Sequence, residues 1–371
     1  MEAPVETWSR FRGFRECLSS IGRYGHPAME QHKRAEKITK EQTDFLEPMR
    51  AFRCLRLKVE AKATGHILLP PYLGSTLRGA FGMALLRSAC ALRRQKCPTC
   101  LLRARCIYSY TFETSPMNGS EADRRYGTAP HPFVLNLETG REGVQEAGST
   151  FHFGMTLVGR AIDFLPYFVF AFQRMGELGI GKGRGTFEVV RVWSLGSRDD
   201  PQEILYENEV LRMPGEVPGL DHALALSGSL SSRKVRLRFV TPLRLVYEGE
   251  LCTDPPRFHV LARNLLRRLN NLVAFHCEGN EGLCVGPLLD RAETVRLTDR
   301  STAWYDWERY SKRQDKRMKM GGFVGDMTFE GDLEQFLPLL VLGSWVNLGK
   351  GTSFGLGRYS LAPLEGHALA D

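Results

Sequence analysis

The sequence has no long apolar segment and no secretory leader. A run of about 18 uncharged apolar residues, enough to span a bilayer, does not occur, and even residues 164–172 have charged residues close by on both sides. The N-terminus carries Glu2, Glu6 and Arg10 in place of the basic start, apolar centre and small-residue cleavage site of a signal peptide. We therefore expect no membrane partner and a cytoplasmic location.

The composition also lacks the biases of fibrous and unfolded proteins. Hydrophobic residues make up 43% and charged residues 25%, with 37 Gly and 19 Pro, so a collagen, a coiled coil and a disordered chain are excluded. A chain of 371 residues exceeds one ordinary domain and fits two. The net charge of +8 favours a polyanionic partner without identifying it.

Disulfide bonds are not expected, because we place the nine cysteines in a reducing compartment. Three of them cluster as Cys97, Cys100 and Cys106, a C-x2-C-x5-C spacing in which the first pair can chelate an ion from a tight turn. Cys90 is the nearest candidate for a fourth ligand, and His131 is another. Zinc and an iron–sulfur cluster both accept thiolates at this spacing, so the presence and the identity of a structural metal stay open.

An internal duplication is the most informative pattern in the chain. At an offset of 172 residues, and without a gap, six residues of one segment recur in another. They are Met155, Thr156, Gly159, Phe164, Leu165 and Pro166, which match Met327, Thr328, Gly331, Phe336, Leu337 and Pro338. Each copy is typical of a strand, a glycine turn and a helix with Phe-Leu-Pro in its first turn, where proline is tolerated. A glycine loop follows each helix, at residues 179–185 and 349–358.

A strand and a helix are also expected ahead of each copy, at residues 52–63 and 72–93 in the first half and at 235–248 and 258–275 in the second. A short strand follows each glycine loop. The order in each half becomes β-α-β-β-α-β, which predicts an α+β protein with two tandem ferredoxin-like domains, the fold of the RNA-recognition motif. We expect an N-terminal extension without assigned function at residues 1–48, domains at 49–193 and 233–371, and a linker at 194–232.

Both glycine loops are basic, with Lys182 and Arg184 in the first and Lys350 and Arg358 in the second. Glycine lets backbone amides approach an oxygen-rich ligand, and the cations neutralise it, so the loops favour phosphate binding. Neither loop has a nucleotide-binding signature, because each follows a helix whereas a P-loop follows a strand. A tight helix-to-strand connection is the alternative for either loop.

Residues 304–320 interleave cations with aromatic rings, the combination that RNA requires for its phosphates and bases. The candidate RNA contacts in this segment are Tyr305, Arg309, Lys312 and Arg313. A solvated, charged hairpin with a few rings packed beneath it is the alternative. In the helix expected at residues 258–275, leucines at a 3- and 4-residue spacing leave Arg263 and Arg267 on the opposite side, where they are further candidates.

Acid–base chemistry near neutral pH favours histidine. His66 lies in a loop just before the helix that carries Arg78, and the other histidines have less polar settings along the chain. We assign proton transfer to His66 with Tyr72 nearby, and charge stabilisation to Lys350 and Arg78. A surface histidine without a catalytic role is the alternative for His66.

Five segments of the chain resemble a known family. They are LPPYLGSTLRGAFG (residues 69–82), the cysteine cluster, VTPLRL (240–245), WYDWERYSKRQ (304–314) and the stretch at 321–359. From about Met49 to Leu361 the chain resembles the CRISPR-associated endoribonuclease of the RAMP superfamily that processes precursor CRISPR RNA. The resemblance implies two ferredoxin-like domains, glycine loops that contact RNA, and metal-independent cleavage at the repeat-derived hairpin. Members often carry His where this chain has Asn347, and others use a histidine of the first domain, which keeps His66 a candidate.

The resemblance therefore implies an endoribonuclease with precursor crRNA as its partner, and other CRISPR effector-complex subunits as further partners. The expected reaction is attack of a 2′-hydroxyl on the adjacent phosphate, which leaves a 2′,3′-cyclic phosphate and a 5′-hydroxyl and needs no metal. Asn347 cannot accept a proton, so a subunit that binds the 3′ hairpin of the crRNA without cleaving it is the alternative. A nuclease that uses a metal held by the cysteines is a third interpretation.

Overall fold

The structure is a computed structural model that describes residues 44–93, 95–114, 129–137, 143–279, 282–311 and 316–362. It separates into two units, Met1–Asp44 and Phe45–Asp371, and both folded domains belong to the second. Most of the N-terminal extension expected at residues 1–48 lies outside the described residues. The folded part begins slightly before the expected Met49, because Leu46 and Met49 of the short helix η1 (Asp44–Met49) are both buried in a hydrophobic core.

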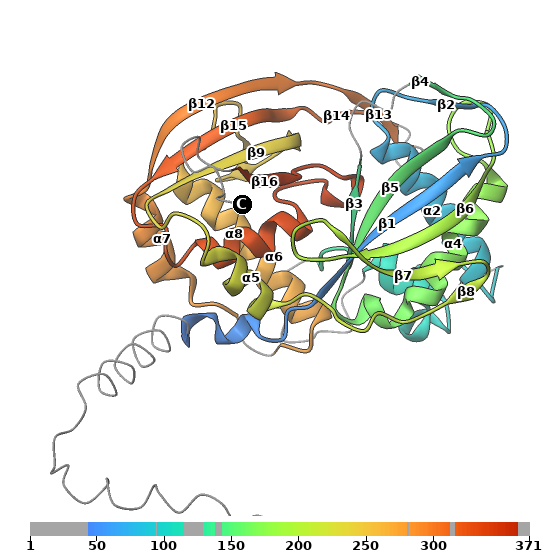
Figure 1. Ribbon diagram of the computed structural model, residues 1–371, viewed down its shortest axis with the longest axis horizontal. Coiled ribbons are helices and arrows are strands. Elements are labelled where there is room, and N and C mark those ends of the chain that lie inside the picture. Colours follow the sequence, from blue (N-terminus) through green and yellow to red (C-terminus); the bar gives the residue numbers. More distant parts are fainter. Residues whose placement is uncertain are drawn as a thin grey trace, which may run out of the picture. The chain divides into compact units, whose positions relative to one another are not determined.

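The first domain is an antiparallel sheet with two helices on one face (Figure 1). Its spatial strand order is β3-β5-β1-β6. Phe81 of the first helix stacks on Phe168 of the second and meets Phe133 of the sheet edge-on, so both helices share one core. The elements are β1 (Cys54–Ala63), α2 (Gly74–Ala89), β3 (Phe133–Asn136), β5 (Thr150–Val158), α4 (Leu165–Leu178) and β6 (Phe187–Leu195).

The second domain repeats this arrangement with the strand order β12-β15-β9-β16. Phe258 of its first helix packs edge-on against Phe329 of the sheet and Phe336 before its second helix. The elements are β9 (Lys234–Leu243), α6 (Phe258–His276), β12 (Arg296–Tyr305), β15 (Gly322–Glu330), α8 (Leu337–Val346) and β16 (Tyr359–Ala362). Counted along the chain, both sheets run 2-3-1-4, which confirms two tandem ferredoxin-like domains.

The duplicated residues occupy equivalent places in the two domains. Pro166 and Pro338 both lie in the first turn of their helices, as the pattern predicted. Helix α4 has 14 residues and α8 has 10, a difference of about one turn. The first glycine loop therefore follows a longer helix than the second, and each loop leads into the next strand of its domain, β6 or β16.

The segment expected as a linker, residues 194–232, contains folded elements. Strands β7 (Pro201–Glu207) and β8 (Val210–Leu211) extend the first sheet, and helix α5 (Leu220–Ser227) packs with α8. Leu205 and Ala223 are buried, so this segment contributes to both cores. Its Gly and Pro residues mark turns between short elements.

The remaining elements are short and mostly border the two domains. They are β2 (Ile67–Leu69), η2 (Cys97–Thr99), η3 (Arg103–Arg105), η4 (Ser109–Glu113), β4 (Gly143–Gln145), η5 (Gly159–Phe164), β10 (Val246–Tyr247), β11 (Glu250–Leu251), α7 (Val285–Glu293), β13 (Glu308–Ser311), β14 (Lys316–Lys319) and η6 (Thr352–Phe354). Among the described helices, none is both long and apolar enough to cross a membrane.

Candidate nucleic-acid interface

The first glycine loop is fixed to its own domain and exposes its cations. The amide of Lys182 donates to the carbonyl of Leu68 in β2 over 3.1 Å, and the amide of Ile180 donates to the carbonyl of Gly185 over 2.9 Å. Lys182 and Arg184 are exposed, and the glycines between them and before them have positive φ angles. The backbone is thus held from inside while both charged side chains face solvent.

His66 lies directly beside this loop. A Cβ atom added at Gly185 would come within 2.2 Å of the His66 carbonyl oxygen, so the two backbones touch. The Nδ1 atom of His66 lies 2.8 Å from Oε2 of Glu146. A carboxylate only accepts, so Nδ1 carries the proton in this pair, and the neutral ring then presents Nε2 as a proton acceptor. The structure therefore brings His66 together with Lys182 and Arg184.

Sequence reasoning missed Glu146 as the partner of His66. The pair depends on β2 and β4, which align Ile67 with Gln145. The two short strands lie far apart in the sequence, and β4 has only three residues, so no periodic pattern marks it. Glu146 directly follows Gln145, which explains how it reaches the histidine.

The second glycine loop closes on itself through buried backbone contacts. The amide of Leu348 donates to the carbonyl of Gly357, and the amide of Gly357 donates to the carbonyl of Pro242. Asn347 is fully buried with φ +58°, and its Nδ2 donates to the carbonyl of Leu356 over 3.1 Å. Asn347 thus holds the loop's two ends together, and its burial keeps its side chain away from any bound RNA.

Most cations around the second loop donate to protein carbonyls. Arg268 of α6 donates to the carbonyls of Val346 and Asn347, at the end of α8. Arg244 donates to Gly321, and Arg358 donates to Leu137 of the first domain over 2.9 Å. Burial lowers the pKa of Arg268 to about 10, so its guanidinium stays charged at neutral pH. By contrast, Lys350 is exposed.

Tyr72 joins the first domain to this loop. Its hydroxyl donates to the carbonyl of Phe354 over 2.9 Å, and its ring stacks on Trp307 with centroids 4.1 Å apart. Burial, with a smaller effect of Tyr305, raises the pKa of Tyr72 well above its ordinary value. Both features disfavour the proton transfer that we expected of Tyr72, because its proton is held by a carbonyl.

Arg78 makes the second contact between the first domain and the loop. Its Nε donates to Oγ of Ser353 over 3.2 Å, its Nη2 lies 3.1 Å from Nε2 of His131, and its guanidinium lies 4.5 Å from the ring centroid of Phe354. Nδ1 of His131 donates to the carbonyl of Thr111, which leaves Nε2 as the acceptor for Arg78. Burial, assisted by Arg78, lowers the pKa of His131 to about 4.

His276 is a buried histidine between the domains. Its Nε2 lies 2.8 Å from the carbonyl of Pro130, to which it donates, and its Nδ1 accepts from the hydroxyl of Tyr110 over 3.2 Å. Burial lowers the pKa of His276 to about 4, and Arg268 adds to the effect. The neutral ring is therefore the form that both partners need. The sequence offered His131 only as a candidate metal ligand and did not single out His276, because their polar partners come from distant segments.

The remaining RNA-contact candidates are dispersed. Arg263 lies over the ring of Tyr247 at 5.9 Å, and Arg267 donates to Asn264 of its own helix; both are exposed, as the helical pattern predicted. Tyr305 is 39% exposed at the end of β12. The backbone of Arg309 lies in β13, while its side chain and all of Lys312 and Arg313 lie outside the described residues.

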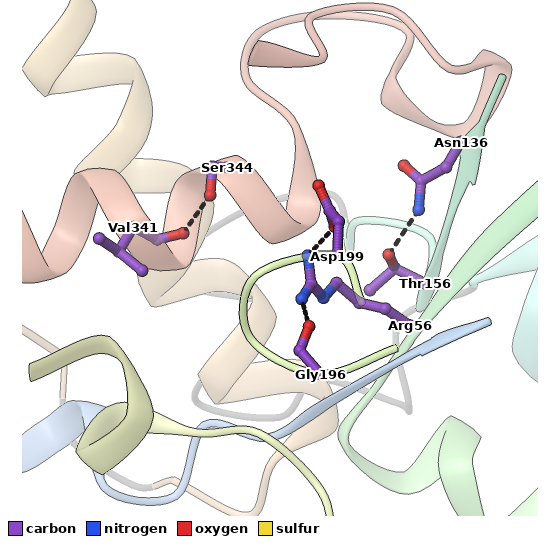
Figure 2. Close-up of polar contacts among 7 residues, drawn as sticks. All are labelled: Arg56, Asn136, Thr156, Gly196, Asp199, Val341 and Ser344. Carbon is purple, nitrogen blue, oxygen red and sulfur yellow. Dashed lines mark hydrogen bonds and ion pairs between the residues drawn. The ribbon is translucent and has the colours of Figure 1, made fainter. Parts of the chain in front are cut away.

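A cavity of about 780 Å³ lies between the first sheet and the second domain's α8 and β16. Four cations line it against one acid: Arg56, Lys58, Arg198 and Arg358 against Asp199. Figure 2 shows the loop after β6 reaching Arg56, whose guanidinium donates to the Gly196 carbonyl and pairs with Asp199. Arg56 is 4% exposed, and its Nε has no partner among the described residues. The cavity is therefore a second positively charged surface.

The four cysteines of the predicted cluster are free and partly buried. The pKa of the Cys97 thiol is raised by burial, then by Glu113 and by the thiols of Cys106, Cys90 and Cys100. Within the described ranges, no three His, Cys, Asp or Glu side chains are already arranged around a metal position. The metal site stays a prediction at this point.

Comparisons with known proteins find similar sequences for both domains. Residues 237–359 match the family described as CRISPR-associated endoribonuclease Cas6, and residues 52–216 match a family described as an N-terminal domain. An uncharacterized protein of Archaeoglobus fulgidus is 24% identical over an alignment of 312 residues, which covers 79% of this chain and 92% of that protein. The boundary between the two matches falls within the segment expected as a linker.

Solved structures share the fold of most of the chain. A Cas6 product complex has a TM-score of 0.52 at 16% identity and covers 84% of this chain and 99% of its own. A partial Cas6-RT-Cas1–Cas2 complex has a TM-score of 0.51 at 15% identity, and the match covers 86% of this chain and 48% of that one. With both domains placed, residues 237–359 are similar to the family of CRISPR-associated endoribonuclease Cas6, and the chain shares its fold with a solved Cas6 structure.

Proposed function

We propose that the chain is an endoribonuclease of CRISPR RNA processing, which binds the repeat hairpin of precursor crRNA and cleaves it without a metal. The family of the second domain supports the class of reaction. The observation that carries the proposal for this chain is the His66–Glu146 pair beside the first glycine loop. The proposal takes His66 as the proton acceptor and the exposed Lys182 and Arg184 as the neighbouring cations, the two functions that cleavage by a neighbouring hydroxyl requires.

The reaction needs three actions from the protein. His66 Nε2 takes the proton of the 2′-hydroxyl while that oxygen attacks the adjacent phosphorus. Lys182 and Arg184 neutralise the charge that develops on the phosphoryl oxygens, with Lys350 as a further exposed cation from the second loop. The bond to the 5′-oxygen then breaks, that oxygen takes up a proton, and a 2′,3′-cyclic phosphate remains. Atoms and charge balance without a metal-bound water.

Tyr72 and Arg78 act as positioning residues in this proposal. Their contacts with Phe354 and Ser353 hold the second loop against the first domain. Lys350 lies three residues before Ser353, so these contacts also limit the places that its ammonium can reach. Substitution of Tyr72 by Phe removes one hydrogen bond and keeps the ring that stacks on Trp307.

The test is single-turnover cleavage of a labelled CRISPR repeat RNA from the genome that encodes the chain, in EDTA. We expect cleavage by the unaltered protein, a cyclic phosphate on the product, and no cleavage when the scissile nucleotide is 2′-deoxy. His66→Ala should lower the rate by about 10²- to 10⁴-fold, the usual range for loss of a general base. Glu146→Gln should give a smaller loss, because it removes only the partner that orients the ring.

Binding measurements separate the proposal from its alternatives. Cleavage of the 2′-deoxy substrate, or loss of all cleavage in EDTA, would contradict the mechanism. If the protein binds the repeat tightly and leaves it intact, and His66→Ala changes neither result, the chain is a subunit that binds the crRNA hairpin without cleaving it. Lys182→Met is the matched control for binding, since it removes a neighbouring cation and leaves the imidazole in place.

A further inference from the structure

The segment that follows helix α2 is folded without a hydrophobic core of its own. From residue 91 to residue 106, every described residue is at least partly exposed, and Leu101 is 83% exposed. The first buried position after them is Ile107. A segment of this length usually needs buried apolar side chains to hold one conformation, so another interaction must hold it.

Successive tight turns run through this segment. The amide of Cys100 donates to the carbonyl of Cys97, and the amide of Arg103 donates to the carbonyl of Cys100. The amide of Cys106 then donates to the carbonyl of Arg103, which places a cysteine at the boundary of each turn. Short turns that begin and end on cysteine are the backbone arrangement of metal-binding knuckles.

Cysteines occupy most of the less exposed positions of the segment. Cys97, Cys100 and Cys106 are half-buried, and their neighbours Pro98 and Thr99 are exposed. Cys90, the residue after α2, is also half-buried. The cysteines are therefore among the positions of this segment that are best shielded from solvent.

Charge in this segment also favours thiolates. Between residues 87 and 106 there are six Lys and Arg residues and no Asp or Glu. A metal with four thiolates carries negative charge, so surrounding cations stabilise it. Disulfides would not use this excess of positive charge, because a disulfide is neutral.

We propose that Cys90, Cys97, Cys100 and Cys106 bind a thiolate-ligated metal centre, either Zn²⁺ or an iron–sulfur cluster, that holds residues 90–106 together against helix α2. The described thiols are not gathered around one point, so binding requires their side chains to rotate within turns that are already formed. The centre is structural, because all four ligands come from the protein and no ligand position stays open. It acts independently of the proposed cleavage chemistry.

Elemental analysis of the full-length protein, purified without chelator and without oxygen, tests the proposal first. We expect about one zinc per chain, or iron with the broad visible absorbance of about four irons per cluster. The element that is found, zinc or iron, shows which metal the cysteines bind. The variant Cys97→Ser/Cys100→Ser should lose this metal, while Cys284→Ser should keep it, because Cys284 is exposed and lies in the second domain.

Trypsin provides a local readout, because the cationic residues of the segment are its cleavage sites. Removal of the metal, or the double Cys variant, should speed cleavage between residues 93 and 105 on the order of tenfold or more, while the rest of the chain stays resistant. Stoichiometric metal that survives in the double variant, metal-free protein with unchanged cleavage, or a disulfide between these cysteines in the mass spectrum would each overturn the proposal. If the double variant is insoluble, the single variant Cys106→Ser is used in its place for the metal analysis and the trypsin digestion.

Discussion

The two glycine loops occupy the same place in two copies of one fold, but the cations around them differ in whether they are exposed or donate hydrogen bonds to protein atoms. The first loop packs on β2 of its own domain and exposes Lys182 and Arg184. The second packs on the other domain, and Arg78, Arg268 and Arg358 around it donate to protein atoms. Duplication thus preserved the backbone while the charges took different roles. A count of cations near a loop therefore overestimates the surface that is open to RNA.

The surroundings of the two loops are expected to differ most in how much acid lowers their stability. His131, which is half-buried, and His276, which is buried, lie between the domains with pKa values of about 4, against an ordinary value of 6.5. The unfolded chain therefore binds more protons than the folded chain between these values. The contribution of the two neutral histidines to the free energy of unfolding is fully present above about pH 6.5. It falls as the pH drops towards 4, by about 3 kcal/mol for each histidine.

Urea denaturation at pH 7 and at pH 4.5 measures this effect. His276→Gln keeps a donor for the Pro130 carbonyl and cannot titrate, so its loss of stability between the two pH values should be smaller by about 2 kcal/mol. His66→Gln at the first loop is the matched control and should keep the full pH dependence, because His66 is 75% exposed. Equal pH dependence in all three proteins would show that the interface between the domains does not sense acid.

The fold could be predicted from the sequence because its signals are local and repeated. The duplication at offset 172 gave the strand, the turn and the helix start of both domains. The leucine spacing of α6 gave its buried face, with Arg263 and Arg267 outside. The short strands β7 and β8 within the expected linker were not predicted, because they depend on a neighbouring strand, and the Gly and Pro residues of this segment resemble those of a loop.

The interface between the domains could not be predicted, because its contacts join residues far apart in the sequence. Tyr72 and Phe354 are 282 positions apart, and Arg78 and Ser353 are 275 apart. Neither pair leaves a periodic pattern that one sequence reveals. Asn347 shows the same limit: its residue type indicated a lost proton acceptor, whereas its buried position gives it a structural role.

A methyl group added to each loop tests how tightly each is packed. Gly357 has φ +70°, and a Cβ there would lie 1.7 Å from the Leu348 carbonyl oxygen. Gly357→Ala should therefore lower the free energy of unfolding by about 4 kcal/mol, from left-handed strain and displaced backbone together. Gly183 has φ +88° with no atom within 4 Å, so Gly183→Ala should cost about 1 kcal/mol. Similar losses in urea denaturation would contradict the difference in packing.

Two adjacent arginines on α6 separate charge that holds the fold from charge on the surface. Arg268 donates to the carbonyls of Val346 and Asn347, while Arg267 is exposed and donates only within its helix. Arg268→Met should lower stability by about 3 kcal/mol, because two buried carbonyls lose a charged donor. Arg267→Met should change it by less than about 0.5 kcal/mol. Thermal unfolding of both variants measures this difference. Equal shifts in melting temperature would show that the guanidinium of Arg268 is not needed at the end of α8.

The smallest effect, and the one that bears most directly on RNA, compares a cation of the first loop with one beside the second. Arg184 is exposed, whereas Arg244 is half-buried and donates to the Gly321 carbonyl. Arg184→Met should weaken binding of repeat RNA by about 1 kcal/mol and reduce the slope of log affinity against log salt by about 1, without changing stability. Arg244→Met should leave the slope unchanged and lower stability by about 1 kcal/mol. Because the two substitutions remove the same charge, a reduced salt slope for Arg244→Met would mean that the second loop also grips the phosphates, and the contrast between the loops would fail.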